Sequence, residues 1–108
     1  MRRGDLVTVA LQGEHGKPRP ALVIQNDQAD QQHYVTVIWL TGTLVDTAPY
    51  LRHTVLPDKI NNLRAISQIE IDRVTTVDRR RIGEVFGRLD DAVLLMVNRL
   101  LTVFLGIG

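Results

Sequence analysis

Arg19 is the residue whose sequence setting most strongly favours chemistry. It lies in "GKPRPALVIQ", residues 16–25, between Pro18 and Pro20. Each proline fixes its own φ at about −65° and pushes the residue before it, Lys17 or Arg19, toward extended geometry. A guanidinium presents a fixed fork of donors that matches a phosphate. The sequence therefore predicts a rigidly held, anion-binding arginine directly before a buried strand.

A second polar group follows in "SQIEID", residues 67–72. Strand alternation places Gln68, Glu70 and Asp72 on one face, opposite the two isoleucines between them. We expect this polar face to meet solvent or a groove. Two neighbouring carboxylates raise each other's pKa and repel a phosphate unless an arginine lies between them. Arg19 and Arg73 are the candidates for that arginine.

Composition narrows the function classes. The 108 residues predict one domain, residues 1–108, and a net charge of +1 does not by itself indicate a nucleic-acid binder. There is no cysteine, and the three histidines lack zinc-type spacing, so we expect no metal site and no cofactor. The C-terminal apolar stretch is interrupted by Asn98 and Arg99, which argues against a membrane span. These features suit a reducing cytoplasm.

Short apolar segments fill the first two-thirds of the chain. The patterns predict strands at residues 5–11, 21–26, 34–40, 52–56, 65–72 and 74–78, with a charged turn at 78–81. Tyr34 and Trp39 share a strand but point to opposite faces, one toward the core and the other available for stacking. So many strands with little helix between them favour a strongly bent antiparallel sheet or small barrel.

The last third has the period of a helix. Asp90 and Asp91 are typical of its start, and Gly106 of its end. Its polar residues form one narrow face, and apolar residues cover most of the remainder. Such a helix needs more cover than one sheet face gives, so we expect either a deep cleft or a second copy of the chain, a homodimer.

Five segments, taken together and in order, carry a resemblance. They are "MRRGDLVTVAL", "GKPRPALVIQ", "VTVIWLTGTL", "SQIEIDRVTTVD" and "VFGRLDDAVLLMVNRLLTVFLG". They resemble the MazF/PemK (Kid) family of toxin-antitoxin endoribonucleases through essentially the whole chain. The resemblance implies a small SH3-like antiparallel β-barrel of the MazF/PemK/CcdB type with a C-terminal helix. It also implies a homodimeric toxin that cuts single-stranded RNA without metal. The resemblance further implies that a cognate antitoxin covers the RNA groove, and that the toxin associates with DNA only as part of the antitoxin complex.

The resemblance also implies catalytic residues. Arg19 matches the family's phosphate-binding arginine, and Thr41 matches a threonine at the end of the third strand. Asp72 matches the catalytic base of PemK-like members, and His15 a histidine in their first loop. The expected reaction is attack by the RNA's own 2′-hydroxyl, which leaves a 2′,3′-cyclic phosphate and a 5′-hydroxyl.

Two positions depart from the family pattern. Gly42 stands where a serine is common, and Thr43 is the candidate to replace that hydroxyl. Glu70 stands where the PemK branch carries a catalytic arginine, a reversal of charge. Asp72 is therefore either a base or a structural hydrogen-bond acceptor. Further RNA contacts are expected from polar and charged side chains near these segments: Arg3, Lys17, Thr43, Arg52, Gln68 and Glu70.

Three alternatives stay open at this point. A toxin of the related CcdB type would bind DNA gyrase without cutting anything, although the Arg19 motif argues against it. An inactive member acting with its antitoxin in autoregulation would explain Gly42 and Glu70. A plain SH3-like interaction module would need an aromatic groove that the sequence does not predict.

Overall fold

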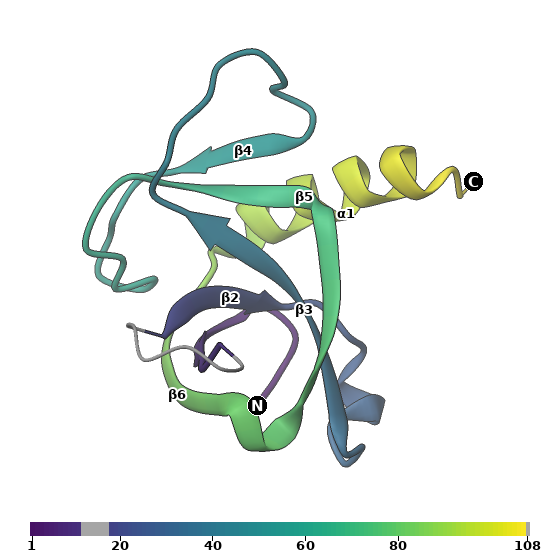
Figure 1. Ribbon diagram of the computed structural model, residues 1–108. Helices are drawn as coiled ribbons and strands as arrows, with labels where there is room; N and C mark the ends of the chain where they lie inside the picture. Colours follow the sequence, from purple (N-terminus) through teal and green to yellow (C-terminus); the bar gives the residue numbers. More distant parts are fainter. Residues whose placement is uncertain (12–17, 108) are drawn as a thin grey trace.

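The computed structural model describes residues 1–11 and 18–107, which form an antiparallel sheet and a C-terminal helix (Figure 1). The sheet has six strands in the order β4-β5-β3-β2-β1-β6. The predicted strongly bent antiparallel sheet with a C-terminal helix is confirmed, and because β4 and β6 are its edges the sheet is not closed into a barrel. The elements are β1 (Asp5–Val9), β2 (Arg19–Val23), η1 (Asp27–Ala29), β3 (Tyr34–Thr41), β4 (Arg52–Val55), β5 (Ser67–Asp78), η2 (Arg79–Arg81), β6 (Ile82–Arg88) and α1 (Asp91–Leu105).

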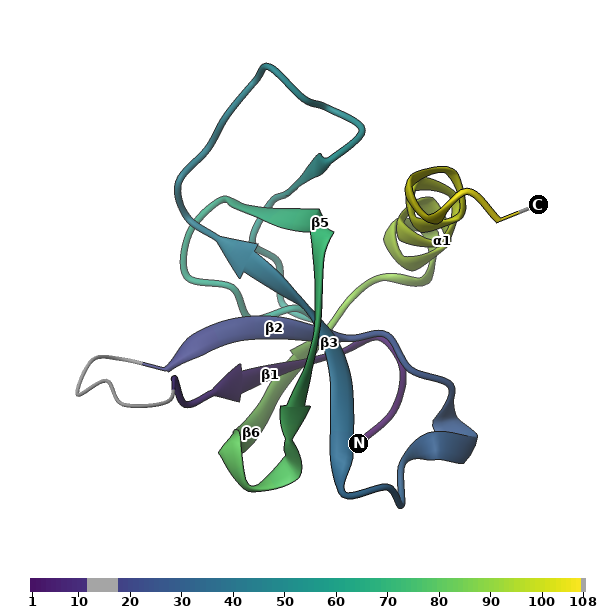
Figure 2. The same ribbon diagram turned by 45° about the vertical axis from the view of Figure 1, so that its right-hand side comes forward.

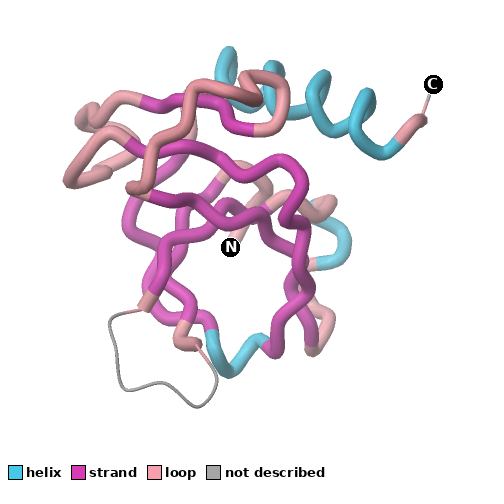
Figure 3. The backbone as a smooth tube through the Cα atoms, turned by 45° about the horizontal axis from the view of Figure 1, so that its top comes forward, coloured by secondary structure: helices cyan, strands magenta, loops and turns pink. Residues whose placement is uncertain are grey.

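Alternating apolar residues build a core on each face of the strands. On one face Leu6, Leu22 and Ile38 belong to a buried cluster that includes Val97 and Leu101 of α1. On the other face a valine-rich cluster with Trp39 fills the space between the strands as they curl round (Figure 3). Burial on both faces holds the strand ends in fixed positions.

β5 turns a corner at residues 70–73 (Figure 1). In its register with β3, Ile38 pairs with Val74 and Leu40 with Ile69, so residues 70–73 lie opposite Trp39 alone. Such irregularities bend a strand and often re-aim side chains beside functional sites. The strands predicted at 65–72 and 74–78 are therefore one strand with a corner, while β6 was not predicted at all.

α1 has the predicted ends. The Asp90 side chain accepts a hydrogen bond from the Ala92 backbone N–H (3.2 Å), and Gly106 adopts a left-handed φ of 71° at the C-cap. The C-terminal half of α1 extends past β5 (Figure 1), and Figure 2 shows the helix nearly along its axis. Large apolar side chains are exposed along α1 and just after it: Leu95, Met96, Val103, Phe104, Leu105 and Ile107. Within the described part of the chain, no helix has the length and apolar character needed to cross a bilayer.

Candidate functional site

Five charged side chains meet at the β5 corner, and we call them the Glu70 cluster: Arg19, Arg52, Glu70, Asp72 and Arg73. Glu70 is central. Its Oε1 is 3.2 Å from Nη2 of Arg19, and its Oε2 is 3.7 Å from Nη2 of Arg52 and 3.4 Å from Nε of Arg73. Arg52 also pairs with Asp72. An arginine does lie between the two carboxylates, but it is Arg52; Arg19 and Arg73, the candidates from the sequence, pair with Glu70 and not with Asp72.

Neighbouring strands deliver these residues to one end of the sheet. Arg19 begins β2 and Arg52 begins β4, where it pairs with Glu70 of β5. Arg19 and Thr41 each lie two residues beyond the Ala21–Trp39 pair of β2 and β3. The site is therefore built by strand register, which explains why residues distant in sequence converge.

Arg19 is fixed through one edge of its guanidinium. Its Nη2 reaches Glu70 and the Leu40 carbonyl (3.5 Å), and its Cζ lies 5.1 Å from the centre of the Trp39 ring. Among the described residues, none bonds Nε or Nη1 of Arg19, whose side chain is 35% exposed. Arg19 can thus present a second edge to a phosphate. Trp39 is buried beneath the Arg19 guanidinium, and the sequence did not predict this contact.

Thr41 lies at the end of β3 with its hydroxyl available as a donor. Its Oγ1 accepts a hydrogen bond from the Thr43 backbone N–H (3.1 Å), which leaves the O–H to donate. Thr43 itself is exposed. A Cβ added at Gly42 would meet nothing within 4 Å, so this position has room for a side chain.

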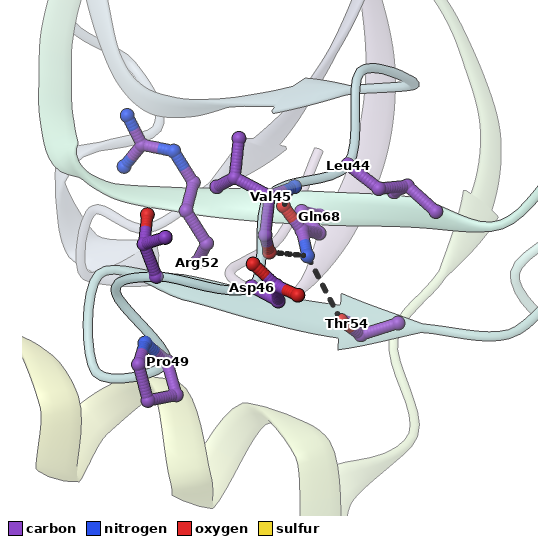
Figure 4. Close-up of a pocket in the computed structure, with 8 residues that line it drawn as sticks. Leu44, Val45, Asp46, Pro49, Arg52, Thr54 and Gln68 are labelled. Atoms are coloured by element: carbon purple, nitrogen blue, oxygen red, sulfur yellow. Dashed lines mark hydrogen bonds between the residues drawn. The ribbon is translucent and has the colours of Figure 1, made fainter.

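Of the polar face expected to meet solvent or a groove, Gln68 lines a pocket and Glu70 is surrounded by arginines, so neither faces solvent. Gln68 and Glu70 are 4% and 5% exposed, because the segment around Val45 covers Gln68 and three guanidiniums cover Glu70. The Gln68 amide donates to the Val45 carbonyl (2.8 Å) and Thr54 Oγ1 (3.1 Å), and accepts from the Val45 N–H (3.0 Å) (Figure 4). Gln68 therefore holds the segment around Val45 in place rather than presenting itself to RNA. Only Asp72 of the predicted polar face is exposed.

A pocket of about 690 Å³ adjoins the Glu70 cluster (Figure 4). Arg52 belongs to both, since it lines the pocket while pairing with Glu70 and Asp72. The rest of the lining comes from β4, β5 and the segment before β4: Leu44, Val45, Asp46, Thr47, Pro49, Thr54 and Gln68. The pocket therefore leaves open space next to Arg52.

Other predicted residues are not brought into the cluster. Arg3 donates through Nε to the Ile24 carbonyl (2.7 Å) and lines a separate pocket with residues of α1, away from the Glu70 cluster, so its contact with RNA stays a prediction. His15 and Lys17 lie outside the described residues. In residues 1–11 and 18–107, no group of three His, Asp or Glu side chains is placed to hold a metal ion.

Comparisons with known proteins agree on one family. The model of the PemK-like, MazF-like toxin of type II toxin-antitoxin systems matches residues 2–105. A relative from Mycolicibacterium smegmatis, called a probable endoribonuclease MazF, is 44% identical over 100% of this chain and 99% of its own length. The structure of the Mycobacterium tuberculosis toxin MazF-mt6 is similar, with a TM-score of 0.80 and 19% identity over 96% of this chain and 98% of that one. An endoribonuclease in complex with its cognate antitoxin, from a mycobacterial species, has a TM-score of 0.75 and 19% identity over 100% and 95%.

Proposed function

Because this chain belongs to the family of PemK-like, MazF-like toxins of type II toxin-antitoxin systems, we propose that it is an endoribonuclease that cleaves single-stranded RNA at specific sequences. Its substrate is messenger RNA in the cytoplasm, and cleavage stops translation and growth. The whole of residues 1–108 forms one toxin domain. One observation carries the proposal: the Arg19 guanidinium is anchored through Nη2 alone, its side chain is 35% exposed, and no described residue bonds its Nε or Nη1. The named relatives are ribonucleases, so gyrase binding is set aside.

The reaction uses the nucleophile of the substrate. The 2′-oxygen forms a bond to phosphorus while the bond from phosphorus to the 5′-oxygen breaks, so the products are a 2′,3′-cyclic phosphate and a 5′-hydroxyl. The Nε and Nη1 edge of Arg19 stabilises the charge that develops on the phosphorane oxygens. The Thr41 hydroxyl orients a phosphate oxygen or the 2′-oxygen.

Two proton transfers complete the reaction. Asp72 Oδ2 accepts the 2′-hydroxyl proton, because Arg52 engages Oδ1 and no described residue bonds Oδ2. His15 remains the predicted donor to the leaving 5′-oxygen. Arg52, Lys17 and Thr43 contribute contacts to neighbouring nucleotides, of which the pocket beside Arg52 takes one.

The proposal is tested with a long unstructured RNA in excess EDTA. We expect cuts at a fixed short sequence, with cyclic phosphate and 5′-hydroxyl ends, and loss of cutting in Arg19→Ala. The matched control is Arg80→Ala, which removes an exposed arginine outside the site. Equal cleavage by wild type and Arg19→Ala, with folding checked by circular dichroism, would contradict the proposed site.

Homodimerisation and antitoxin binding complete the proposal. The exposed apolar side chains of α1 form the kind of surface that a second copy covers. The antitoxin binds over the cationic face of the Glu70 cluster and excludes RNA. Light scattering should give a dimer mass for the wild type, and Phe104→Glu should lower it toward the monomer, whereas Arg99→Glu on the same helix should not. A monomeric wild type at micromolar concentration would contradict the dimer.

A further inference from the structure

Glu70 is the most buried ionised side chain of the site. Its side chain is 7% exposed, compared with 31% for Asp72, and three guanidiniums surround it. A buried carboxylate is costly unless it is paired and hydrogen-bonded. Three arginines on one face would in turn repel one another without a counter-charge. Glu70 and the arginines therefore depend on one another for their positions.

The two carboxylate oxygens of Glu70 pair with different arginines. Oε1 faces Arg19, which crosses from β2, while Oε2 faces Arg52 and Arg73. Glu70 is itself fixed by its pairing with Arg52 across β4 and β5. Since Oε1 engages only Nη2 of Arg19, the contact holds this guanidinium against Trp39 without consuming its second edge.

We propose that Glu70 is a positioning residue for RNA cleavage: its buried carboxylate holds the Arg19 guanidinium in the orientation that meets the scissile phosphate. The inference rests on the proposed function and adds a role to a residue that does not touch RNA. The inference explains the reversed charge at this position. In PemK-like relatives the resemblance implies an arginine here, whereas in this chain Glu70 orients an arginine from another strand. An arginine at position 70 would join three others with no buried counter-charge.

Trp39 reports the position of Arg19 without any reference to activity. It is the single tryptophan of the chain, and it is 8% exposed beneath the Arg19 guanidinium. If Arg19 leaves the ring, collisional quenchers such as acrylamide gain access to it. Arg19→Ala sets the upper limit of this increase in quenching.

The test compares Glu70→Gln and Glu70→Ala with Glu84→Gln, a control that neutralises an exposed carboxylate on β6. Among the described residues Glu84 has no ion pair. Both Glu70 variants should increase acrylamide quenching toward the level of Arg19→Ala, and kcat for RNA cleavage should fall about 10-fold to 100-fold with KM changed less. Adding Glu70→Gln to Arg19→Ala should give no further loss in kcat, because the carboxylate then has no guanidinium to hold. Glu84→Gln should match the wild type in both measurements.

The outcomes separate this inference from the proposed function. Wild-type quenching in the folded Glu70 variants would overturn the positioning role, whether or not the protein cleaves RNA. Increased quenching with unchanged kcat would also overturn it, because Arg19 would then act equally well from another orientation. Absence of cleavage by the wild type would instead remove the proposed function, while quenching would still show whether Glu70 holds Arg19. If Glu70→Ala does not fold, the isosteric Glu70→Gln decides the matter.

Discussion

The two ends of the β3–β5 ladder are both rich in arginine and aspartate, but they use these residues differently. At the far end is the Arg79 turn, residues 78–81, where Arg79 donates to the Gln32 carbonyl (2.8 Å) and to the backbone and side chain of Asp30. Arg80 pairs with Asp78 (2.9 Å), and Arg81 donates to the Ala10 carbonyl (2.7 Å). At the corner end, Arg19, Arg52 and Arg73 converge on one buried carboxylate.

The difference shows that a count of arginines does not locate a phosphate site. In the Arg79 turn, each guanidinium bonds a nearby loop carbonyl or an adjacent carboxylate, so these arginines stabilise the local fold. In the Glu70 cluster the counter-charge lies behind the arginines, and Arg19 keeps an edge that no described residue bonds. A buried carboxylate beneath exposed guanidinium donors distinguishes a candidate anion-binding site from arginines that only stabilise the fold.

The largest contrast between the two ends should appear on exchanging arginine for lysine. Arg19→Lys keeps the positive charge but loses the planar fork, so we expect kcat/KM for RNA cleavage to fall about 100-fold to 1000-fold. Arg80→Lys, at a side chain that is 82% exposed, should stay within about 2-fold of wild type. Comparable losses in both variants would mean that overall charge, rather than donor geometry, determines activity.

The sequence predicted the strands well and their connection less well. Residues 65–72 and 74–78 carry two separate strand patterns, and the structure joins them through the corner at residues 70–73. Local alternation cannot reveal such a corner, because it results from pairing with two different partners, β4 and β3. β6 escaped prediction because glycines interrupt its pattern. Gly87 is needed there, since a Cβ would lie 2.1 Å from the Asn61 carbonyl oxygen.

The site was predictable as a set of residues but not as an arrangement. The proline-flanked Arg19 was identifiable from local sequence, whereas Thr41 was named only through the resemblance to the family. Alternation placed Gln68 and Glu70 on one face but could not show that the segment around Val45 and three arginines bury them. Trp39 gave no signal of its contact with Arg19, because cross-strand packing depends on a register that the sequence does not specify.

Stability rather than activity should change at the Arg79 turn. Arg79→Ala removes the donors to the Gln32 and Asp30 carbonyls, so the free energy of unfolding should fall by about 1–2 kcal/mol in urea titrations. kcat should remain within about 2-fold of wild type at a temperature where the variant is folded. A folded Arg79→Ala protein with 10-fold lower kcat would break the distinction between the two ends.

Mild acid should also affect the two ends differently. Burial lowers the pKa of His53 on β4 below its ordinary value of 6.5, whereas hydrogen bonding from Arg80 holds the pKa of Asp78 well below its usual range. The unfolded chain therefore protonates His53 more readily than the folded one, and stability falls as the pH drops below about 6.5 until the folded pKa is passed. Asp78 keeps its charge throughout this range.

Chemical denaturation at several pH values between 7 and 5 checks this expectation. His53→Gln should weaken the pH dependence of the free energy of unfolding. Identical pH profiles for wild type and His53→Gln would show that the burial of this imidazole carries no proton linkage.

The smallest effect is expected at Gly42, where the corner end departs from the family pattern. Gly42→Ser places a hydroxyl next to Thr41, and since its Cβ meets no atom within 4 Å, the free energy of unfolding should change by less than about 0.5 kcal/mol. If the added hydroxyl reaches the phosphate held by Arg19, KM for RNA should fall while Trp39 quenching stays constant, because Arg19 itself does not move. Gly42→Ala, which adds the carbon without the hydroxyl, is the matched control. An equal change in KM for both variants would assign the effect to the backbone at the end of β3. A change in KM for Gly42→Ser alone would show that hydrogen-bond donors around Arg19, and not Arg19 alone, limit RNA binding at this end of the sheet.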